Sequence, residues 1–300
     1  MKMSIEEILE DIRSDRVKKV IYDADSGCDI DDQYAIAHAF VSPRMELLSV
    51  NSTPYIVEGQ TIDEALENSY NENNKVLKAL HCTVPNCIGC TETVSGQPDF
   101  GPVDCPAVRN IVDTAMASDE IIYVLSTGAL THAASAILME PAIKDKICVI
   151  WVGCTGKESG VTDEFNLNND YRAGQIVLNS GVPFVFLPSF CSYGTINLKA
   201  VKADLDKLTG TSDAAVFFRE YLPGRFDIIN EEWSSIFWDV ASTGVLAVPE
   251  GFKLSIIPAP VFTDDKRYVF DSTRHKIIYM EGIDKDIVLG DVFRCIQSLG

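Results

Sequence analysis

The sequence has few basic residues for its length. Its 300 residues include 25 Lys and Arg against 44 Asp and Glu, which gives a formal net charge of −19, and only four histidines. A surface this negative repels phosphate backbones and anionic lipid headgroups, so neither a nucleic-acid nor a membrane partner is expected. No apolar run approaches the roughly 20 residues that span a bilayer. The charged N-terminus also lacks the apolar centre of a secretory signal, so the sequence predicts a cytoplasmic protein.

The cysteine pattern gives no disulfide framework. Nine cysteines are an odd number, and several lie in apolar runs typical of buried strands. We therefore expect reduced thiols. Cys87 and Cys90 have the spacing of a zinc half-site, but Cys82 and Cys105 do not have the spacing of its second half. These four are expected to be free cysteines on the wall of a pocket.

Apolar runs alternate with helical patterns along most of the chain, and hydrophobic residues make up 46% of it. Near-continuous apolar strands between helices are typical of a parallel sheet covered on both faces. The prediction is an α/β fold, with one domain over residues 1–300 that begins with a leading helix at 1–15. Strands are expected near 17–22, 45–51, 120–126, 147–153 and 182–187, and helices near 32–41, 61–80, 130–139 and 170–180.

The pattern changes after residue 250. Short apolar runs at 253–257, 267–270 and 275–280 are separated by turns, which indicates a small antiparallel annex. A helical pattern at 285–299 follows it. The predicted architecture is therefore a mostly parallel central sheet flanked by helices, with an antiparallel addition near the C-terminus.

Five aspartates follow the first predicted strand directly. No Lys or Arg lies between Lys19 and Arg44 to neutralise them. So many carboxylates in one turn repel one another unless a cation lies among them, and oxygen ligands favour Ca²⁺ or Mg²⁺. The turn sits where parallel sheets carry their functional sites. The aspartates are Asp23, Asp25, Asp29, Asp31 and Asp32.

Three motif families compete for this turn. An EF-hand loop requires Gly at its sixth position and Glu at its twelfth; counted from Asp23, Gly27 is fifth and Tyr34 is twelfth, so that interpretation fails. A Mg²⁺-dependent phosphatase of the haloacid-dehalogenase type also begins with a strand and Asp-x-Asp, and would use Asp23 or Asp25 as nucleophile. The third family accounts for more of the chain.

The run from Asp23 to Asp32 resembles the N-terminal signature of the inosine-uridine preferring nucleoside hydrolases, in a variant with two extra residues, Asp29 and Ile30, before the Asp pair. Further segments resemble the family's motifs in the family's order. They are Ser126-Thr127-Gly128-Ala129-Leu130-Thr131, Glu164-Phe165-Asn166, and Trp238-Asp239. The resemblance spans roughly residues 17 to 250.

This resemblance implies a Ca²⁺-dependent hydrolase that cleaves the N-glycosidic bond of a ribonucleoside or related N-riboside in purine or pyrimidine salvage. The metal ligands it implies are the carboxylates of Asp25, Asp32 and Asp239 and the carbonyl of Thr127, all hard oxygen donors. Three carboxylates around a dication leave one negative charge, which suits the oxocarbenium character that develops on ribose. Ca²⁺ acidifies water far less than Zn²⁺, so a carboxylate must accept the proton.

By the same resemblance Asp25 is the base, and Asp31 is the second catalytic residue through its contact with a ribose hydroxyl. Asn166 would bind another hydroxyl, Glu164 would reach the 5′ side, and Asp239 would serve both metal and sugar. Asp29 is an open alternative to Asp31, which is favoured because it keeps the Asp-Asp pair. The other expected partner is a second copy of the chain, in a dimer or tetramer.

The sequence departs from the family pattern at the position of the leaving-group acid. Many members have a His there, whereas this chain has Trp238, which would either stack on the nucleobase or lie in the core. This motivates a second hypothesis, a member that binds a ribosyl ligand without turnover. Of the histidines, His38 is expected to be packed, and His132 to act only indirectly on the pocket. Base preference would depend on loops near 52–60, 82–105 and 220–238.

Overall fold

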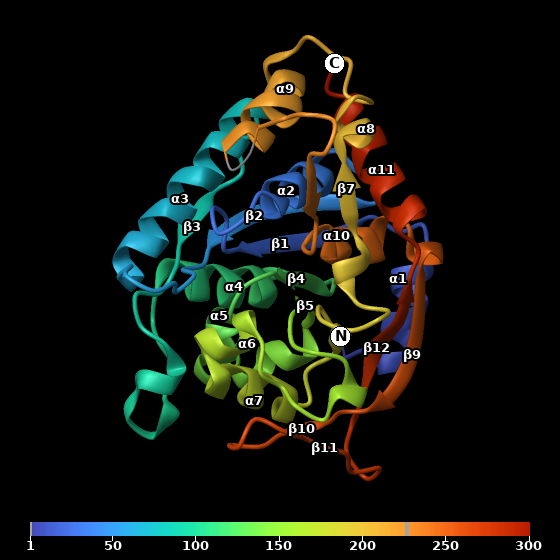
Figure 1. Ribbon diagram of the computed structural model, residues 1–300. Helices are drawn as coiled ribbons and strands as arrows, with labels where there is room; N and C mark the ends of the chain where they lie inside the picture. The colour runs from blue at the N-terminus through green and yellow to red at the C-terminus, as the bar shows by residue number, and fades with distance from the viewer. Residues whose placement is uncertain (1, 226–227) are drawn as a thin grey trace.

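One eight-stranded sheet organises the fold, with strand order β3-β2-β1-β4-β5-β6-β12-β9 (Figure 1). The computed structural model describes residues 2–225 and 228–300; Met1 and part of the 220–238 loop lie outside them. Every neighbouring pair in this sheet is parallel except β12 with β9. Its strands are β1 (Lys18–Ala24), β2 (Met45–Ser52), β3 (Asn86–Ile88), β4 (Ile122–Ser126), β5 (Ile147–Val152), β6 (Phe184–Leu187), β9 (Phe252–Pro258) and β12 (Lys276–Ile283).

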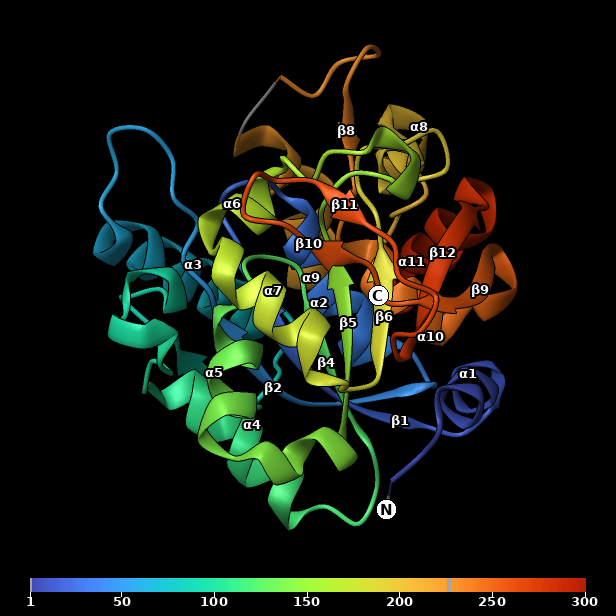
Figure 2. The same ribbon diagram turned by 90° about the horizontal axis from the view of Figure 1, so that it is seen from below.

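Helices cover both faces of the sheet, as the alternation of patterns predicted. The helices are α1 (Ile5–Arg13), α2 (Asp31–Val41), α3 (Ile62–Ala79), α4 (Pro106–Ala117), α5 (Thr131–Met139), α6 (Phe165–Asn169), α7 (Tyr171–Ser180), α8 (Lys202–Leu205), α9 (Asp213–Val216), α10 (Val240–Ala247) and α11 (Lys285–Gln297). Apolar residues of α1, α2, α10 and α11 form one core cluster, and those of α4, α5 and α7 form the other. Figure 2 shows these two groups on opposite sides of the strands.

Local sequence explains where the first helix begins. Ser4 and Glu7 form a capping box, because each side chain accepts a hydrogen bond from the other residue's backbone N–H. Ile8, Leu9 and Ile12 are the buried residues of this helix. None of the helices in the described part of the chain is long and apolar enough to cross a membrane.

The C-terminal annex is only partly separate from the main sheet. β12 pairs in parallel with β6, and β9 pairs antiparallel with β12, so these two predicted annex strands extend the central sheet. β10 (Val261–Phe262) and β11 (Tyr268–Val269) form the short separate antiparallel sheet. A further antiparallel pair, β7 (Lys199–Val201) with β8 (Ser234–Ile236), was not predicted, because three-residue strands carry too little pattern to recognise.

Candidate active site

A pocket lies at the carboxyl ends of the central strands. Asp25 follows β1, Thr127 follows β4, and Ser189 follows β6 by two residues. Because parallel strands point the same way, these ends meet at one edge of the sheet, where α/β folds place their ligands. The pocket is lined by Asp25, Cys28, Asp29, Asp31, Asp32, Thr127, Val152, Glu164, Phe165, Asn166, Ser189, Phe190, Trp238 and Asp239. All eight residues that the family resemblance assigned to catalysis, metal or substrate are among them.

Three carboxylates converge at the buried end of this pocket. Asp25, Asp32 and Asp239 each offer an oxygen, and these oxygens lie within 4.8 Å of one another. Burial and the neighbouring carboxylates raise the pKa values of Asp25 and Asp239. Burial raises the pKa of Asp32 to about 6. Carboxylates this close and this desolvated are ionised at neutral pH when a cation lies between them, so the donor set fits a hard metal ion.

Thr127 fixes the position of Asp32. Its hydroxyl lies 2.7 Å from Asp32 Oδ1 and 3.1 Å from the carbonyl oxygen of Asp23. The next residue, Gly128, passes against Asp25: an added Cβ would lie 3.0 Å from Asp25 Cβ, Cγ and Oδ2. The turn after β4 therefore needs glycine for this close approach, and it holds two of the converging carboxylates in place.

Asp31 and Asp29 occupy different depths of the pocket. Asp31 is buried, and its carboxylate accepts hydrogen bonds from the backbone N–H groups of Asp32 and Asp239, both at 3.2 Å. Burial, together with the charge of Asp29, raises the pKa of Asp31. Asp29 is only half-buried and accepts a hydrogen bond from the backbone N–H of Ile30 at 2.8 Å. The two-residue addition thus adds a carboxylate to the pocket lining that is more exposed than Asp31.

Glu164 and Asn166 are held by backbone groups. Glu164 is the N-cap of α6, and its Oε2 accepts hydrogen bonds from the N–H groups of Cys154 and Leu167. Burial raises the pKa of Glu164. Asn166 donates from Nδ2 to the carbonyls of Thr127 and Val152, at 2.7 and 3.0 Å. Since both donations use Nδ2, the amide oxygen is the atom of Asn166 that can accept from a ligand hydroxyl.

Aromatic side chains line part of the pocket. Trp238 is half-buried, and its ring centroid lies 4.9 Å from that of Phe190, which is 48% exposed. Trp238 therefore contacts the pocket as well as the core. Phe190 and Ser189 were not predicted, although their position just after β6 could have identified them by the same strand-end rule. Phe165 was not predicted as a lining residue either, although it belongs to the Glu164-Phe165-Asn166 motif.

His132 does not line the pocket, but it contacts Asp23 in β1, two residues before Asp25. Its Nδ1 is 2.6 Å from Asp23 Oδ1, and its Nε2 accepts a hydrogen bond from the backbone N–H of Cys90 at 3.1 Å. Asp23 and His132 are both fully buried and neither lines the pocket. A phosphatase that used Asp23 as nucleophile would need this carboxylate to be accessible, and it is not.

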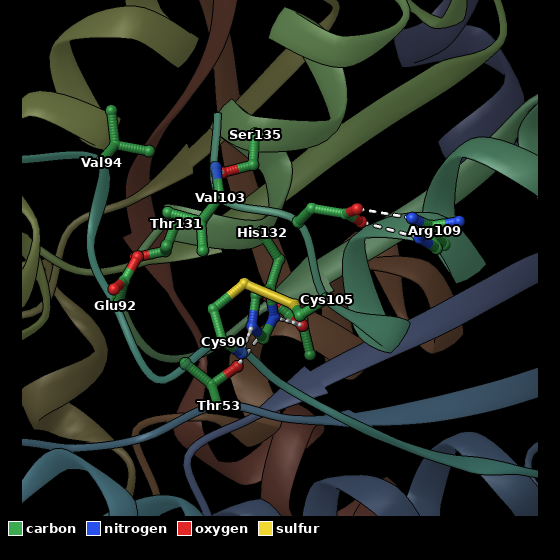
Figure 3. The surroundings of a disulfide bond; sticks show 12 residues. Thr53, Cys90, Glu92, Val94, Val103, Cys105, Arg109, Thr131, His132 and Ser135 are labelled. Carbon is green, nitrogen blue, oxygen red and sulfur yellow. Dashed lines mark hydrogen bonds and ion pairs between the residues drawn. A yellow bond between two sulfur atoms is a disulfide. The ribbon is translucent and has the colours of Figure 1, made fainter. Parts of the chain in front are cut away.

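The expectation of reduced cysteines is wrong for one pair. Cys90 and Cys105 form a disulfide, with their Cα atoms 5.3 Å apart (Figure 3). Cys90 follows β3 and Cys105 is the N-cap of α4, so the fold of the 89–105 connection brings together two residues that sequence spacing did not link. Cys82 and Cys87 remain free. None of these four cysteines lines the pocket described above.

His38 is packed, as expected. It is fully buried, with Nε2 2.9 Å from Asp291 Oδ2 and Nδ1 2.8 Å from Thr243 Oγ1. These contacts join α2, which carries Asp31 and Asp32, to α10 and α11.

Comparison with known proteins agrees with this geometry. The family model for inosine-uridine preferring nucleoside hydrolases matches residues 20–280. The pyrimidine-specific ribonucleoside hydrolase RihB of Escherichia coli is 32% identical over 217 residues. That match covers 64% of this chain and 66% of the relative, so the similarity spans just under two thirds of that curated protein's length.

Solved structures with the same fold cover nearly the whole chain. An inosine-guanosine nucleoside hydrolase superposes with a TM-score of 0.74, at 18% identity, over 93% of this chain and 98% of its own. A purine-preferring ribonucleoside hydrolase from Gardnerella vaginalis superposes with a TM-score of 0.71, at 18% identity, over 94% and 99%. The comparisons favour neither a phosphatase nor a member without turnover.

Proposed function

The chain belongs to the inosine-uridine preferring nucleoside hydrolase family, and we propose from this that it hydrolyses the N-glycosidic bond of a ribonucleoside or related N-riboside. The products are ribose and the free base. The observation that carries the proposal is the convergence of Asp25, Asp32 and Asp239 within one pocket at the carboxyl edge of the sheet.

The proposed metal is Ca²⁺, held by Asp25, Asp32, Asp239 and the carbonyl of Thr127. Two oxygens that bind one Ca²⁺ at about 2.3–2.6 Å lie at most about 5 Å apart, and the 4.8 Å spread of the three carboxylates fits that limit. The Thr127 carbonyl accepts one hydrogen bond from Asn166 and retains its second lone pair. When bound, the ion would orient the attacking water and lower its pKa modestly.

Asp25 is the proposed general base. Its carboxylate accepts a proton from water as the water oxygen bonds to the anomeric carbon. The electron pair of the breaking C–N bond goes to the departing nucleobase. The carboxylates beside it keep the pocket negative and so stabilise the cationic character that develops on the ribose. The Gly128 backbone supports this role, because it limits where the Asp25 side chain can lie.

The ribose is proposed to bind between Asp31, Asn166, Glu164 and Asp239. Asp31 suits a hydroxyl better than Asp29, because it is buried and oriented by the backbone of Asp239. Asn166 would accept from a hydroxyl through its amide oxygen, and Glu164 would face the 5′ side. A site built to bond vicinal hydroxyls loses much of its binding energy with deoxyribose. Trp238 would stack on the base, with Phe190 beside it.

The compartment, assembly and base preference are part of the same proposal. We place the enzyme in the cytoplasm, in nucleoside salvage, as a homo-oligomer. The similar proteins include both pyrimidine-specific and purine-preferring hydrolases, so they leave the preferred nucleobase open.

The direct test is release of reducing sugar from a panel of ribonucleosides and deoxyribonucleosides, with and without chelator. Asp25→Asn is expected to lower kcat by about 100-fold or more. The control is Asp113→Asn, an equal change of charge at an exposed position on α4, which should leave kcat unchanged. Sugar release that persists in Asp25→Asn would contradict the assigned base, and release that persists in chelator would contradict the metal.

A further inference from the structure

The pocket contains one carboxylate, Asp29, beyond those assigned above to the metal and the ribose. Six of the fourteen lining residues are carboxylates. Three of them form the converging set of Asp25, Asp32 and Asp239. The other three are Asp29, Asp31 and Glu164, and the described lining includes no Lys, Arg or His to balance them. With a dication bound, the ionised pocket would still be strongly negative.

Two of the three additional carboxylates are already directed at backbone N–H groups. Asp31 accepts from Asp32 and Asp239, and Glu164 accepts from Cys154 and Leu167. Asp29 is different, because it is only half-buried; it accepts a hydrogen bond from the adjacent Ile30 N–H, and its other side-chain partner is Ser235. Of the three additional carboxylates, Asp29 is therefore the most accessible to a ligand in the pocket.

Two aromatic side chains line the same pocket as Asp29. Phe190 and Trp238 lie with ring centroids 4.9 Å apart at an interplanar angle of 45°, and Phe190 is about half exposed. A cation close to the face of Trp or Phe is attracted by the ring quadrupole. A carboxylate and two aromatic rings lining one pocket are a combination that binds a positively charged, flat group.

The chemistry of the leaving group points the same way. A neutral nucleobase departs with a negative charge unless an acid protonates it. Trp238 occupies the position where many family members have the His that would serve as this acid. A base that already carries a positive charge takes up the electron pair of the C–N bond and departs neutral. In that case water supplies the oxygen, Asp25 takes the proton, and no acid is needed for the base.

We propose that this pocket prefers N-ribosides whose base carries a fixed positive charge, and that Asp29, Phe190 and Trp238 select that charge. The proposal rests on the proposed hydrolase function and narrows its substrate class. Phosphorylated ribosides should be poor substrates, because the same charge repels them.

The test compares the hydrolysis of 1-ribosylpyridinium with that of a neutral nucleoside, uridine or inosine, whichever is cleaved faster. The C–N bonds of the two substrates differ in intrinsic reactivity. This difference cancels when the kcat/KM of each substrate is compared with its own value at another salt concentration or in another variant. Raising ionic strength from about 20 to about 500 mM should lower kcat/KM several-fold for the cation and less than about twofold for the neutral substrate.

Asp29→Asn should reduce the ratio of cationic to neutral kcat/KM by about tenfold. Phe190→Leu, which keeps an apolar wall, should reduce it by about threefold. Asp113→Asn, with the same loss of charge on the outer face of α4, should leave the ratio within about twofold. If Asp29→Asn does not fold, Phe190→Leu still tests the preference for a cationic nucleobase.

The outcomes separate the two levels of the proposal. A ratio that Asp29→Asn and Phe190→Leu leave unchanged, or equal salt dependence for both substrates, would overturn the cation preference while the hydrolase function stands. No sugar release from any riboside would overturn both.

Discussion

Replacing His132 with Ala is expected to destabilise the whole domain, although His132 does not line the pocket. Its ring is fully buried and bridges Asp23 in β1 to the backbone of Cys90. Because Nε2 accepts from the Cys90 N–H, the ring proton lies on Nδ1 and is donated to Asp23. The imidazole thus pairs with one oxygen of the buried Asp23 carboxylate and with one buried N–H group, while Asp23 Oδ2 has no hydrogen-bond partner among the described residues.

The magnitude follows from those two contacts. A hydrogen bond to a charged group contributes about 1.5–3 kcal/mol, and a buried N–H left without a partner costs about 1–3 kcal/mol. We therefore expect His132→Ala to lower the free energy of unfolding by about 3–5 kcal/mol. For 300 residues the unfolding entropy is about 0.6 kcal/mol per kelvin, so Tm should fall by about 5–8 °C.

The assay is scanning calorimetry at one pH and one Ca²⁺ concentration, with His132→Asn as the matched variant. An Asn side chain can still donate an N–H to Asp23, so its Tm should lie between those of the wild type and His132→Ala. A loss below about 2 °C in the Ala variant, or an equal loss in both variants, would refute the assigned contacts.

Three further predictions concern the pocket and the disulfide. Gly128→Ala should lower kcat by about 10- to 100-fold, because the added Cβ would lie 3.0 Å from Asp25 and displace this general base. A lower kcat in steady-state kinetics with an unchanged Tm would confirm this, and an unchanged kcat would contradict it. In chelator-treated protein, the pKa of Asp32 is raised from 3.8 to about 6, so the folded state binds a proton there more tightly than the unfolded state. This proton stabilises the fold fully below pH 3.8, and the stabilisation is lost as the pH rises through 6. Added Ca²⁺ should therefore raise Tm more near pH 7.5 than near pH 5, and an equal rise would count against a metal at this site. Alkylation of unfolded, unreduced protein should label seven of the nine cysteines and spare Cys90 and Cys105; mass spectrometry that finds nine labels would exclude the disulfide.

The fold was predictable from the sequence where elements are long and strongly patterned. The apolar runs that became β1, β2, β4, β5 and β6 were located to within a few residues, because strands buried on both faces are continuously hydrophobic. β3 and α4 were missed: β3 has three residues, and α4 follows a Cys- and Pro-containing loop that hides its start. The pairing of β12 with β6 was missed because register between distant strands leaves no trace in local pattern.

The chemistry of the site was also visible in part. The acidic turn after the first strand pointed to Asp25 and Asp32, the family motifs added Asp239, and the structure places all three in one pocket. Their roles in binding metal and substrate remain predictions for the experiments above. Phe190 belongs to no motif, and only its place after β6 beside Trp238 makes it a lining residue.

The sequence alone determined a strongly acidic α/β chain with aspartates at the end of its first strand and a family signature in order. Those properties are local or compositional, so the chain itself encodes them directly. Only the tertiary structure decided how closely residues more than 200 positions apart approach in one pocket, that Cys90 meets Cys105, and that Asp29 is half-buried while Asp31 is buried. The physical reason is that parallel strands gather their carboxyl ends at one edge. Depth, burial and distance at that edge depend on the packing of the whole sheet.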